Sequence, residues 1–223
     1  MTTIRACVFD AYGTLFDVHS AVRRHAELVG VHADAVSAMW RTRQLEYTWV
    51  RTLMGRYADF WRCTTDALEF ALSQHGLQTR GRLQECLLES YRTLTPYPEV
   101  HGLLQELQST GIKTAILSNG TPEMLEAAVH SAGLGDIPLP LLSVESLGIY
   151  KPSPPVYQLA VDALGIEARD ISFQSSNAWD VAGARAFGFH AVWINRSRQA
   201  DEYGLRGVVP ELTSLAGLTH ELP

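Results

Sequence analysis

The sequence predicts an α/β fold: a doubly wound, Rossmann-like parallel sheet core with an inserted helical cap subdomain. The apolar run Ile4–Phe9 has the character of a buried strand and ends at a turn signal, Tyr12-Gly13-Thr14. From about Ser20 to Leu94 the chain shows helical periods and no convincing strand. After Pro96-Tyr97-Pro98, strand-like and helix-like segments alternate, which is typical of a parallel sheet with helices on both faces. We therefore expect a core domain over residues 1–17 and 97–223 and a cap subdomain over residues 18–96.

Local signals predict the elements in chain order. Met39–Leu53 and Tyr57–Gln74 are the clearest amphipathic helices of the expected cap. In the core, Thr121 is placed to cap the helix that follows it. The expected core strands are Lys113–Leu117, Leu139–Val144, Asp170–Phe173 and His190–Ile194, and the expected core helices are Pro122–Ala132, Pro154–Leu164 and Ala178–Phe187.

The composition is that of an ordinary globular protein. The chain has 223 residues, of which 46% are hydrophobic and 19% charged, and its formal net charge is −6. This charge argues against nucleic-acid partners and against a membrane surface, so an anion site has to be built locally from a few Lys or Arg residues. The three cysteines are widely spaced, which favours free thiols in a reducing cytosol over a disulfide framework or a zinc site. The start of the chain does not resemble a secretory signal, and we expect a cytoplasmic location.

Polar residues follow several of the expected strands, at the point where each strand ends. Open parallel sheets bind ligands beyond the carboxyl ends of their strands, so these residues are site candidates. Because these strand ends share one edge of the sheet, the segments are expected to converge. They are Asp10-Ala11-Tyr12-Gly13-Thr14, Ser118-Asn119-Gly120, Lys151-Pro152 and Ser175-Ser176-Asn177-Ala178-Trp179-Asp180.

Asp10 is the centre of this expected site. Alone, an aspartate at a strand end is explained as a cap of the Gly13-Thr14 turn. The convergence of four polar segments favours a reactive role, because Lys151 could keep the carboxylate ionised while neighbouring hydroxyls orient it. Those hydroxyls are Thr14, Ser118 and Ser175. A carboxylate that is oriented and partly stripped of water is a nucleophile for covalent catalysis.

The four segments resemble, in order, the four motifs of the haloacid dehalogenase superfamily, and the likeness covers essentially the whole chain. The superfamily consists mostly of magnesium-dependent phosphatases, so membership alone leaves the reaction open. Those phosphatases carry a second Asp two positions after the nucleophile as general acid, where this chain has Tyr12. Tyrosine, with an ordinary pKa of about 10, does not replace a carboxylate. The cap segments Met39-Trp40-Arg41, Gln44–Trp49 and Met54–Trp61 resemble those of the L-2-haloacid dehalogenases.

The resemblance implies an (S)-2-haloacid dehalogenase, a hydrolase acting on carbon–halide bonds with no metal and no cofactor. Asp10 would displace halide from a short L-2-haloalkanoic acid, and hydrolysis of the aspartyl ester would give the D-2-hydroxy acid. The implied partners are therefore a small anionic 2-halo acid and a halide ion, and the family likeness suggests a homodimer.

The resemblance also assigns roles to the residues. Arg41 and Asn119 match halide-binding positions, and Asp180, supported by Asn177, would activate water. The implied catalytic residues are Asp10, Thr14, Arg41, Lys151, Ser175, Asn177 and Asp180. The implied substrate-binding residues are Arg41 again, Phe60 and Trp179 as an apolar wall, Asn119, Tyr157, and Ser118 with the backbone amides at Ala11 and Tyr12 around the carboxylate.

Alternatives stay open on the sequence alone. A magnesium-dependent phosphatase of the same superfamily would need a metal site and a general acid, and a non-catalytic protein could retain the fold. Arg41 has a simpler explanation as a solvated helix arginine, and Phe60 and Trp179 as core aromatics. Asp180 could simply favour the start of a helix. Thr42 stands where related caps often carry a larger polar residue, which bears on pocket size.

Overall fold

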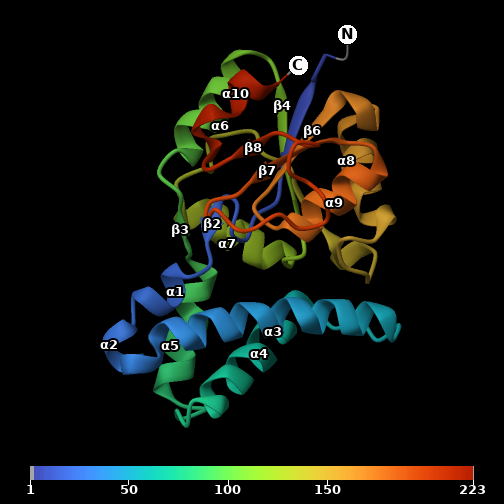
Figure 1. Cartoon of the computed structure of the whole chain (residues 1–223). Coiled ribbons are helices and arrows are strands. Elements are labelled where there is room, and N and C mark those ends of the chain that lie inside the picture. Colours follow the sequence, from blue (N-terminus) through green and yellow to red (C-terminus); the bar gives the residue numbers. More distant parts are fainter. Residues whose placement is uncertain (1–2, 223) are drawn as a thin grey trace.

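The computed structural model describes residues 3–222, and a six-stranded parallel sheet forms their centre (Figure 1). The strand order is β5-β4-β1-β6-β7-β8. Every residue of β1 is buried, because helices cover both faces of the sheet, and this accounts for its continuous apolar sequence. The strands are β1 (Ala6–Phe9), β4 (Lys113–Ser118), β5 (Leu141–Ser143), β6 (Ile171–Ser175), β7 (His190–Ile194) and β8 (Glu211–Leu212).

The strand order reverses next to β1, and this reversal positions the site. From β1 the chain moves to β4 and β5 on one side and then returns to β6 on the other. Phe9, the last residue of β1, pairs with Ile116 of β4 and Gln174 of β6. The carboxyl ends of these three strands therefore meet at the kind of crevice where open sheets bind ligands.

The core helices lie on both sides of the sheet. In Figure 1, α6 (Val100–Ser109) and α10 (Leu218–Glu221) lie on its left, and α8 (Pro154–Leu164) and α9 (Ala178–Phe187) on its right. Helix α7 (Pro122–Ser131) contacts β5, and Thr121 caps it by accepting a hydrogen bond from Met124 N. Short 3-10 turns occur at Gly30–His32, Val144–Ser146, Ala168–Asp170 and Leu215–Gly217.

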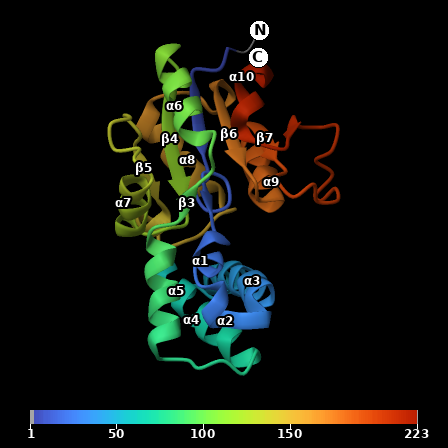
Figure 2. The same cartoon turned by 90° about the vertical axis from the view of Figure 1, so that its left-hand side faces the viewer.

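The segment between β2 and β3 is entirely helical and forms a separate layer beyond the carboxyl ends of the strands (Figures 1 and 2). In its long helix α3, the buried residues Val36, Trp40, Gln44 and Thr48 recur every four positions and Ser37 adjoins them, so a single stripe faces inward. That stripe packs on α4, and Trp40 Nε1 donates to Thr64 O at 2.8 Å. The helices are α1 (Ser20–Arg23), α2 (Ala26–Val29), α3 (Ala33–Leu53), α4 (Phe60–Gln74) and α5 (Arg82–Arg92).

Two short strands join the helical layer to the sheet-bearing part. β2 (Phe16–Asp17) pairs antiparallel with β3 (Thr95–Pro96), and Tyr97 N donates to Leu15 O at 3.0 Å. The outgoing and returning chain therefore run side by side. The division into domains at residues 17 and 97 stays a prediction, although the connection lies at these positions.

The predicted fold class is confirmed, and the differences lie at element ends. His190–Ile194 and the helices Pro154–Leu164 and Ala178–Phe187 have the expected bounds. The first strand begins at Ala6 rather than Ile4, and α4 begins at Phe60 rather than Tyr57 because Asp59 caps it by accepting from Arg62 N. The remaining core strands, α3 and α7 differ from expectation by one to six residues at an end.

Some elements were not expected from the sequence. Helix α6 and the strands β2, β3 and β8 fall in this group, and each of these strands has only two residues, too few to show a period. No helix within residues 3–222 combines the length and apolar character needed to span a bilayer.

Candidate active site

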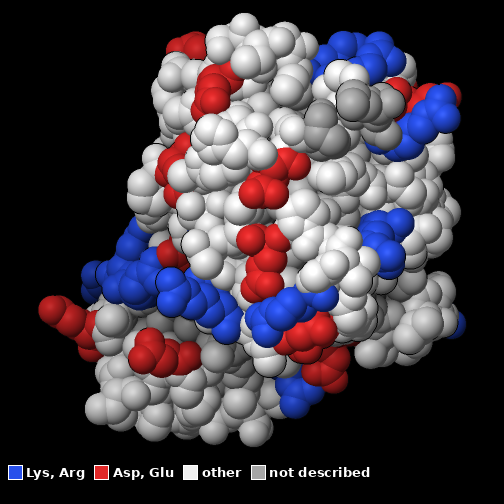
Figure 3. Space-filling view, turned by 45° about the horizontal axis from the view of Figure 1, so that its top comes forward, with Lys and Arg blue, Asp and Glu red and all other residues white. Residues whose placement is uncertain are grey.

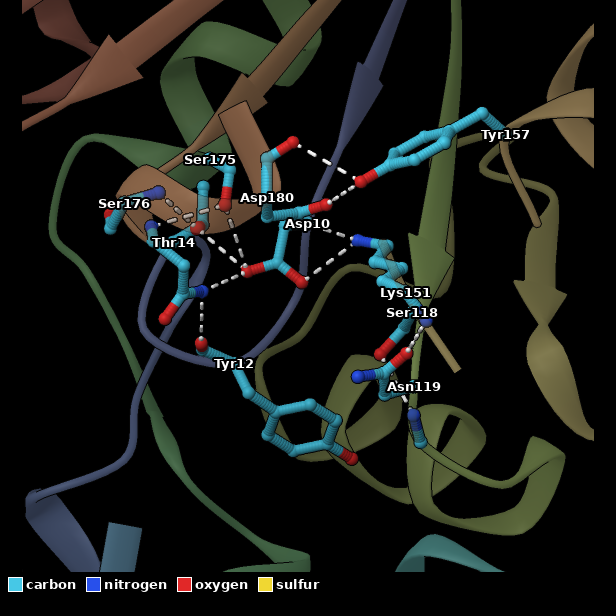
Figure 4. Close-up of polar contacts among 12 residues, drawn as sticks. Asp10, Tyr12, Thr14, Ser118, Asn119, Lys151, Tyr157, Ser175, Ser176 and Asp180 are labelled. Carbon is cyan, nitrogen blue, oxygen red and sulfur yellow. Dashed lines mark hydrogen bonds and ion pairs between the residues drawn. The ribbon is translucent and has the colours of Figure 1, made fainter. Parts of the chain in front are cut away.

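Asp10 directly follows β1 and lies 5% exposed at the crevice (Figure 4). Its Oδ2 accepts hydrogen bonds from Thr14 Oγ1 at 3.0 Å, Asn177 Nδ2 at 2.9 Å and Ser175 Oγ at 3.4 Å. These donors come from the turn after β1 and from the end of β6, two of the predicted polar segments. The contacts fix the carboxylate in one orientation and replace much of its water shell.

Lys151 lies between two carboxylates. Its side chain is fully buried, and Nζ is 3.2 Å from Asp10 Oδ1 and 2.9 Å from Asp180 Oδ2. The ammonium also lies 4.9 Å from the centroid of the Phe173 ring. Burying an ammonium without partners is very costly, so the two carboxylates and the lysine stabilise one another. One cation is thus shared by two anions.

Asp180 is fully buried in the first turn of α9. Tyr157 Oη donates to its Oδ1 at 2.8 Å, and Lys151 donates to Oδ2. Burial, the largest cause, raises the pKa of Asp180 to about 6; Lys151 opposes the rise and the negative charge of Asp10 adds to it. Asp180 is therefore ionised at neutral pH and is a stronger base than an ordinary aspartate.

Gly183 makes the contact between Tyr157 and Asp180 sterically feasible. A Cβ at position 183 would lie 2.5 Å from Tyr157 Oη and 2.6 Å from Pro152 Cβ, closer than real Cβ contacts. Gly183 lies one helical turn after Asp180, so the missing side chain leaves room for the phenol to approach α9. A glycine inside a helix weakens the helix, and here packing gives the reason for it.

Tyr12 turns its ring away from the Asp10 carboxylate (Figure 4). The ring stacks on Tyr91 at 5.7 Å and meets Phe60 at 5.4 Å between centroids. Burial raises the pKa of Tyr12 well above its ordinary value, so the phenol stays protonated. A Cβ at Gly120 would come within 2.7 Å of this ring, so the glycine lets the second polar segment pass close to it.

Arg41 reaches from α3 to the crevice. Its guanidinium donates to Gln44 Oε1 at 2.9 Å, to Tyr12 O at 2.9 Å and to Asn177 Oδ1 at 3.2 Å. All three acceptors are neutral, and no carboxylate within residues 3–222 forms an ion pair with Arg41. The positive charge beside Asn177 is therefore available to an anionic ligand.

Aromatic side chains line the boundary between the helical layer and the crevice. Phe60, at the start of α4, is 1% exposed. Trp179, at the start of α9, is half-buried and meets Trp49 of α3 edge-on at 5.3 Å. Both aromatics predicted for the wall thus lie at the boundary between the helical layer and the crevice.

The remaining predicted residues differ in their contacts. Ser118 is buried, but its Oγ accepts from Gly120 N at 3.0 Å and makes no hydrogen bond to Asp10 within the described chain, so the expectation that it orients Asp10 is wrong. Asn119 Oδ1 accepts from Lys151 N at 3.1 Å, which leaves its amide NH2 without an acceptor among residues 3–222. Ala11 is fully buried in the turn after Asp10.

Sequence reasoning missed three supporting residues. Gln44 is buried and connects Arg41 to Tyr91, and Tyr91 stacks on Tyr12. Arg196 donates to Thr14 O at 2.8 Å and forms an ion pair with Glu99 at 2.8 Å. A polar residue on the buried stripe of α3 could have indicated Gln44, whereas no local signal indicates Arg196.

The topology and the buried cluster of Asp10, Lys151 and Asp180 define a class of enzyme whose chemistry rests on an aspartate at a strand end. The family model for haloacid dehalogenase-like hydrolases matches residues 4–188. The chain belongs to this family and, within it, to the subgroup of the L-2-haloacid, or (S)-2-haloacid, dehalogenases.

Relatives and solved structures support the assignment. The chain is 50% identical to (S)-2-haloacid dehalogenase 1 of Pseudomonas sp. (strain CBS-3), over 98% of this chain and 96% of that protein. It is 49% identical to (S)-2-haloacid dehalogenase 4A of Burkholderia cepacia, over 97% and 94%. The L-2-haloacid dehalogenase of Xanthobacter autotrophicus with chloropropionic acid covalently bound superposes with a TM-score of 0.85 at 35% identity, over 97% of each chain. The predicted resemblance is thus confirmed.

Proposed function

We propose that this protein is an (S)-2-haloacid dehalogenase that converts short L-2-haloalkanoic acids to D-2-hydroxy acids. One observation carries the proposal: the buried Asp10 carboxylate is held by four donors beside an arginine, Arg41, that has only neutral partners. An aimed carboxylate next to an uncompensated cation suits a displacement in which negative charge moves from the nucleophile to the leaving group. Two relatives that are 50% and 49% identical to this chain are named as (S)-2-haloacid dehalogenases.

In the first step, an Asp10 oxygen attacks the carbon that bears the halogen. A carbon–oxygen bond forms, the carbon–halogen bond breaks, and the halide leaves with the bonding electrons, so the carbon is inverted. Arg41 and the free amide of Asn119 would stabilise the departing halide, within a wall formed by Phe60 and Trp179.

The substrate carboxylate would lie against donors beside Asp10. Within residues 3–222, the backbone N–H groups of Ala11 and Tyr12 donate no hydrogen bond, which supports this location. Ser118 Oγ, which already accepts from Gly120 N, keeps its own proton to donate to the carboxylate. These three donors would hold the acid with its 2-carbon facing Asp10.

In the second step, water hydrolyses the ester. Asp180 takes a proton from water, the water oxygen attacks the Asp10 carbonyl carbon, and the ester bond to that carbon breaks. The alkoxide, which carries the original Asp10 oxygen, takes the proton from Asp180 and leaves as the hydroxy acid. Asp10 keeps the solvent oxygen and loses the second water proton to solvent. The raised pKa of Asp180, caused mainly by burial, suits this role as general base.

The donor set does not suit a magnesium-dependent phosphatase. Asp10 and Asp180 both bind the Lys151 ammonium, and Tyr12 occupies the position where the phosphatases need an acid. Hard divalent cations favour several oxygen ligands, and a lysine between the carboxylates competes for the same site. Burying Asp10, Lys151 and Asp180 costs free energy, and a non-catalytic role would leave that cost unexplained. We further propose a cytoplasmic homodimer that releases free halide ion.

Halide release tests the proposed function. Purified enzyme with L-2-chloropropionate and excess chelator should release one chloride for each D-lactate formed, at the rate seen without chelator. The D-isomer of the substrate serves as a matched control and should give no chloride. Loss of activity on chelation with recovery in magnesium, or product of retained configuration, would overturn the proposal.

A further inference from the structure

The proposed reaction needs an access route, because its centre is closed to solvent. Asp10 is 5% exposed, and Lys151 and Asp180 are 1% and 0% exposed. A small anion therefore has to cross the protein surface at some point to reach Asp10. Three larger cavities do not provide the route: two, of about 310 and 400 Å³, lie in the helical layer, and one, of about 320 Å³, lies beside the start of β4. None of the three is lined by a residue that contacts Asp10.

A smaller cavity, of about 150 Å³, lies where the helical layer meets the sheet-bearing part. Its lining joins His19 and Arg41 from the helical side to Asn177, Ser197 and Gln199 from loops after β6 and β7. His19, Ser197 and Gln199 are exposed, whereas Arg41 and Asn177 are half-buried. The cavity therefore opens at a polar rim and ends on two residues of the candidate active site.

Asn177 separates the cavity from Asp10, because it contacts both Asp10 and the cavity residue Arg41. Asn177 Nδ2 donates to Asp10 Oδ2 at 2.9 Å, while its Oδ1 accepts from Arg41 at 3.2 Å. The bond from Arg41 to Asn177 is the longest of the three that hold the Arg41 guanidinium. Separating Arg41 from Asn177 would therefore connect the cavity to the nucleophile without disturbing the bonds around Lys151.

The lining suits an anion. Arg41 has no carboxylate partner among residues 3–222, and Arg196, which also lines the cavity, has a buried Nε without a hydrogen-bond partner there. Ser176 Oγ, another lining group, is likewise buried and unpaired within the described chain. On the face drawn in Figure 3, basic side chains gather in a band near the junction of the two layers, although the whole chain carries a net charge of −6. Local positive charge in a cleft raises the concentration of anions at its mouth.

We propose that this cavity is the passage through which the small carboxylate substrate reaches Asp10, with the contact between Arg41 and Asn177 as its inner gate. The proposal rests on the proposed dehalogenase function and adds the route to it. Arg41 then acts twice, first by attracting the incoming carboxylate and later by stabilising the departing halide. A passage of this size also restricts substrates to short chains.

Blocking the rim tests the passage. The side chains of Ser197 and Gln199 make no hydrogen bond within residues 3–222, so Ser197→Trp and Gln199→Trp narrow the rim without removing a bond. Gln74→Trp, at the exposed end of α4, is the matched control, because the Gln74 side chain likewise makes no hydrogen bond within residues 3–222. Acid-quenched single turnovers with L-2-chloropropionate, read as chloride formed per enzyme molecule, give a second-order rate at low substrate and a first-order rate at saturation.

We expect each rim variant to lower the second-order rate at least tenfold, while the saturating rate and the control variant stay within twofold of wild type. A second-order rate within twofold of wild type in both rim variants would overturn the passage, and so would an equal fall in both rates. If wild type itself releases no chloride, the proposed function fails. Chloride release by wild type together with unimpeded rim variants refutes only the route.

Discussion

The two sides of the candidate site are built differently. On the nucleophile side, Asp10, Lys151 and Asp180 are buried and joined by charge-assisted hydrogen bonds of 2.9 to 3.2 Å. On the leaving-group side, Arg41 has only neutral partners and the aromatic residues make only ring contacts. The first arrangement is complete before substrate binds, whereas the second has unused charge and hydrogen-bonding capacity. This difference suggests that the core determines the type of chemistry and the helical layer determines which leaving group and acid are accepted.

The largest effect is expected at Asp10, on the nucleophile side of the site. We expect Asp10→Asn to lower kcat for chloride release by about 10⁴-fold or more, because an amide is a far weaker nucleophile than a carboxylate. Chloride release from L-2-chloropropionate measures the effect, and circular dichroism checks that the fold is retained. Activity above one-hundredth of wild type would mean that Asp10, on the nucleophile side, does not supply the nucleophile.

Asp180→Asn separates the two steps that take place on the nucleophile side, ester formation and ester hydrolysis. We expect ester formation to proceed while hydrolysis slows by about 10²- to 10⁴-fold, the range for loss of a general base. Intact mass should then show an adduct accumulating on the Asp10 peptide. In wild type, a single turnover in oxygen-18 water should label Asp10 and leave the product largely unlabelled; label in the product instead would make water the direct nucleophile.

Arg41→Ala tests the leaving-group side. Removing the cation should lower kcat by about a hundredfold, the scale for losing one transition-state donor. Arg41→Lys is the conservative control and should recover part of the rate, because it restores charge without the planar group. A near-normal kcat in Arg41→Ala would return this residue to the role of a solvated helix arginine.

The pH dependence of ester hydrolysis gives the smallest effect. A general base has to be ionised, and burial raises the pKa of Asp180 to about 6, so hydrolysis should slow as the pH falls through this region. The fall in the hydrolysis rate should be centred somewhat below pH 6. In the ester, Asp10 no longer carries the negative charge that helps to raise the pKa of Asp180. Single-turnover decay of the adduct between about pH 4.5 and 8 measures it. Full-rate hydrolysis at the acid end of this range would exclude Asp180 as the base.

The sequence predicted the nucleophile side better than its surroundings. Asp10, Lys151 and Asp180 each follow a strand or a strand-end loop, and parallel strands bring such positions to one edge. Ser118 follows the same rule, yet its hydroxyl contacts Gly120, because strand-end position does not fix the direction of a side chain. Arg196 acts through a contact 182 residues away in sequence, which no local pattern encodes. Gln44 stands out locally as a polar residue on a buried stripe, but its partners Thr64 and Tyr91 lie 20 and 47 residues away.

The sharing of Lys151 has a consequence for the order in which products leave. At rest, two cations, Lys151 and Arg41, balance two anions, Asp10 and Asp180. Binding the acid adds one unbalanced negative charge, and esterification transfers that excess to the halide without removing it. Departure of the halide restores electrical balance while the ester is still intact, and hydrolysis then regenerates Asp10 and makes the hydroxy acid the surplus anion. Because a buried site favours balanced charge, halide should be the first product out and the hydroxy acid the second.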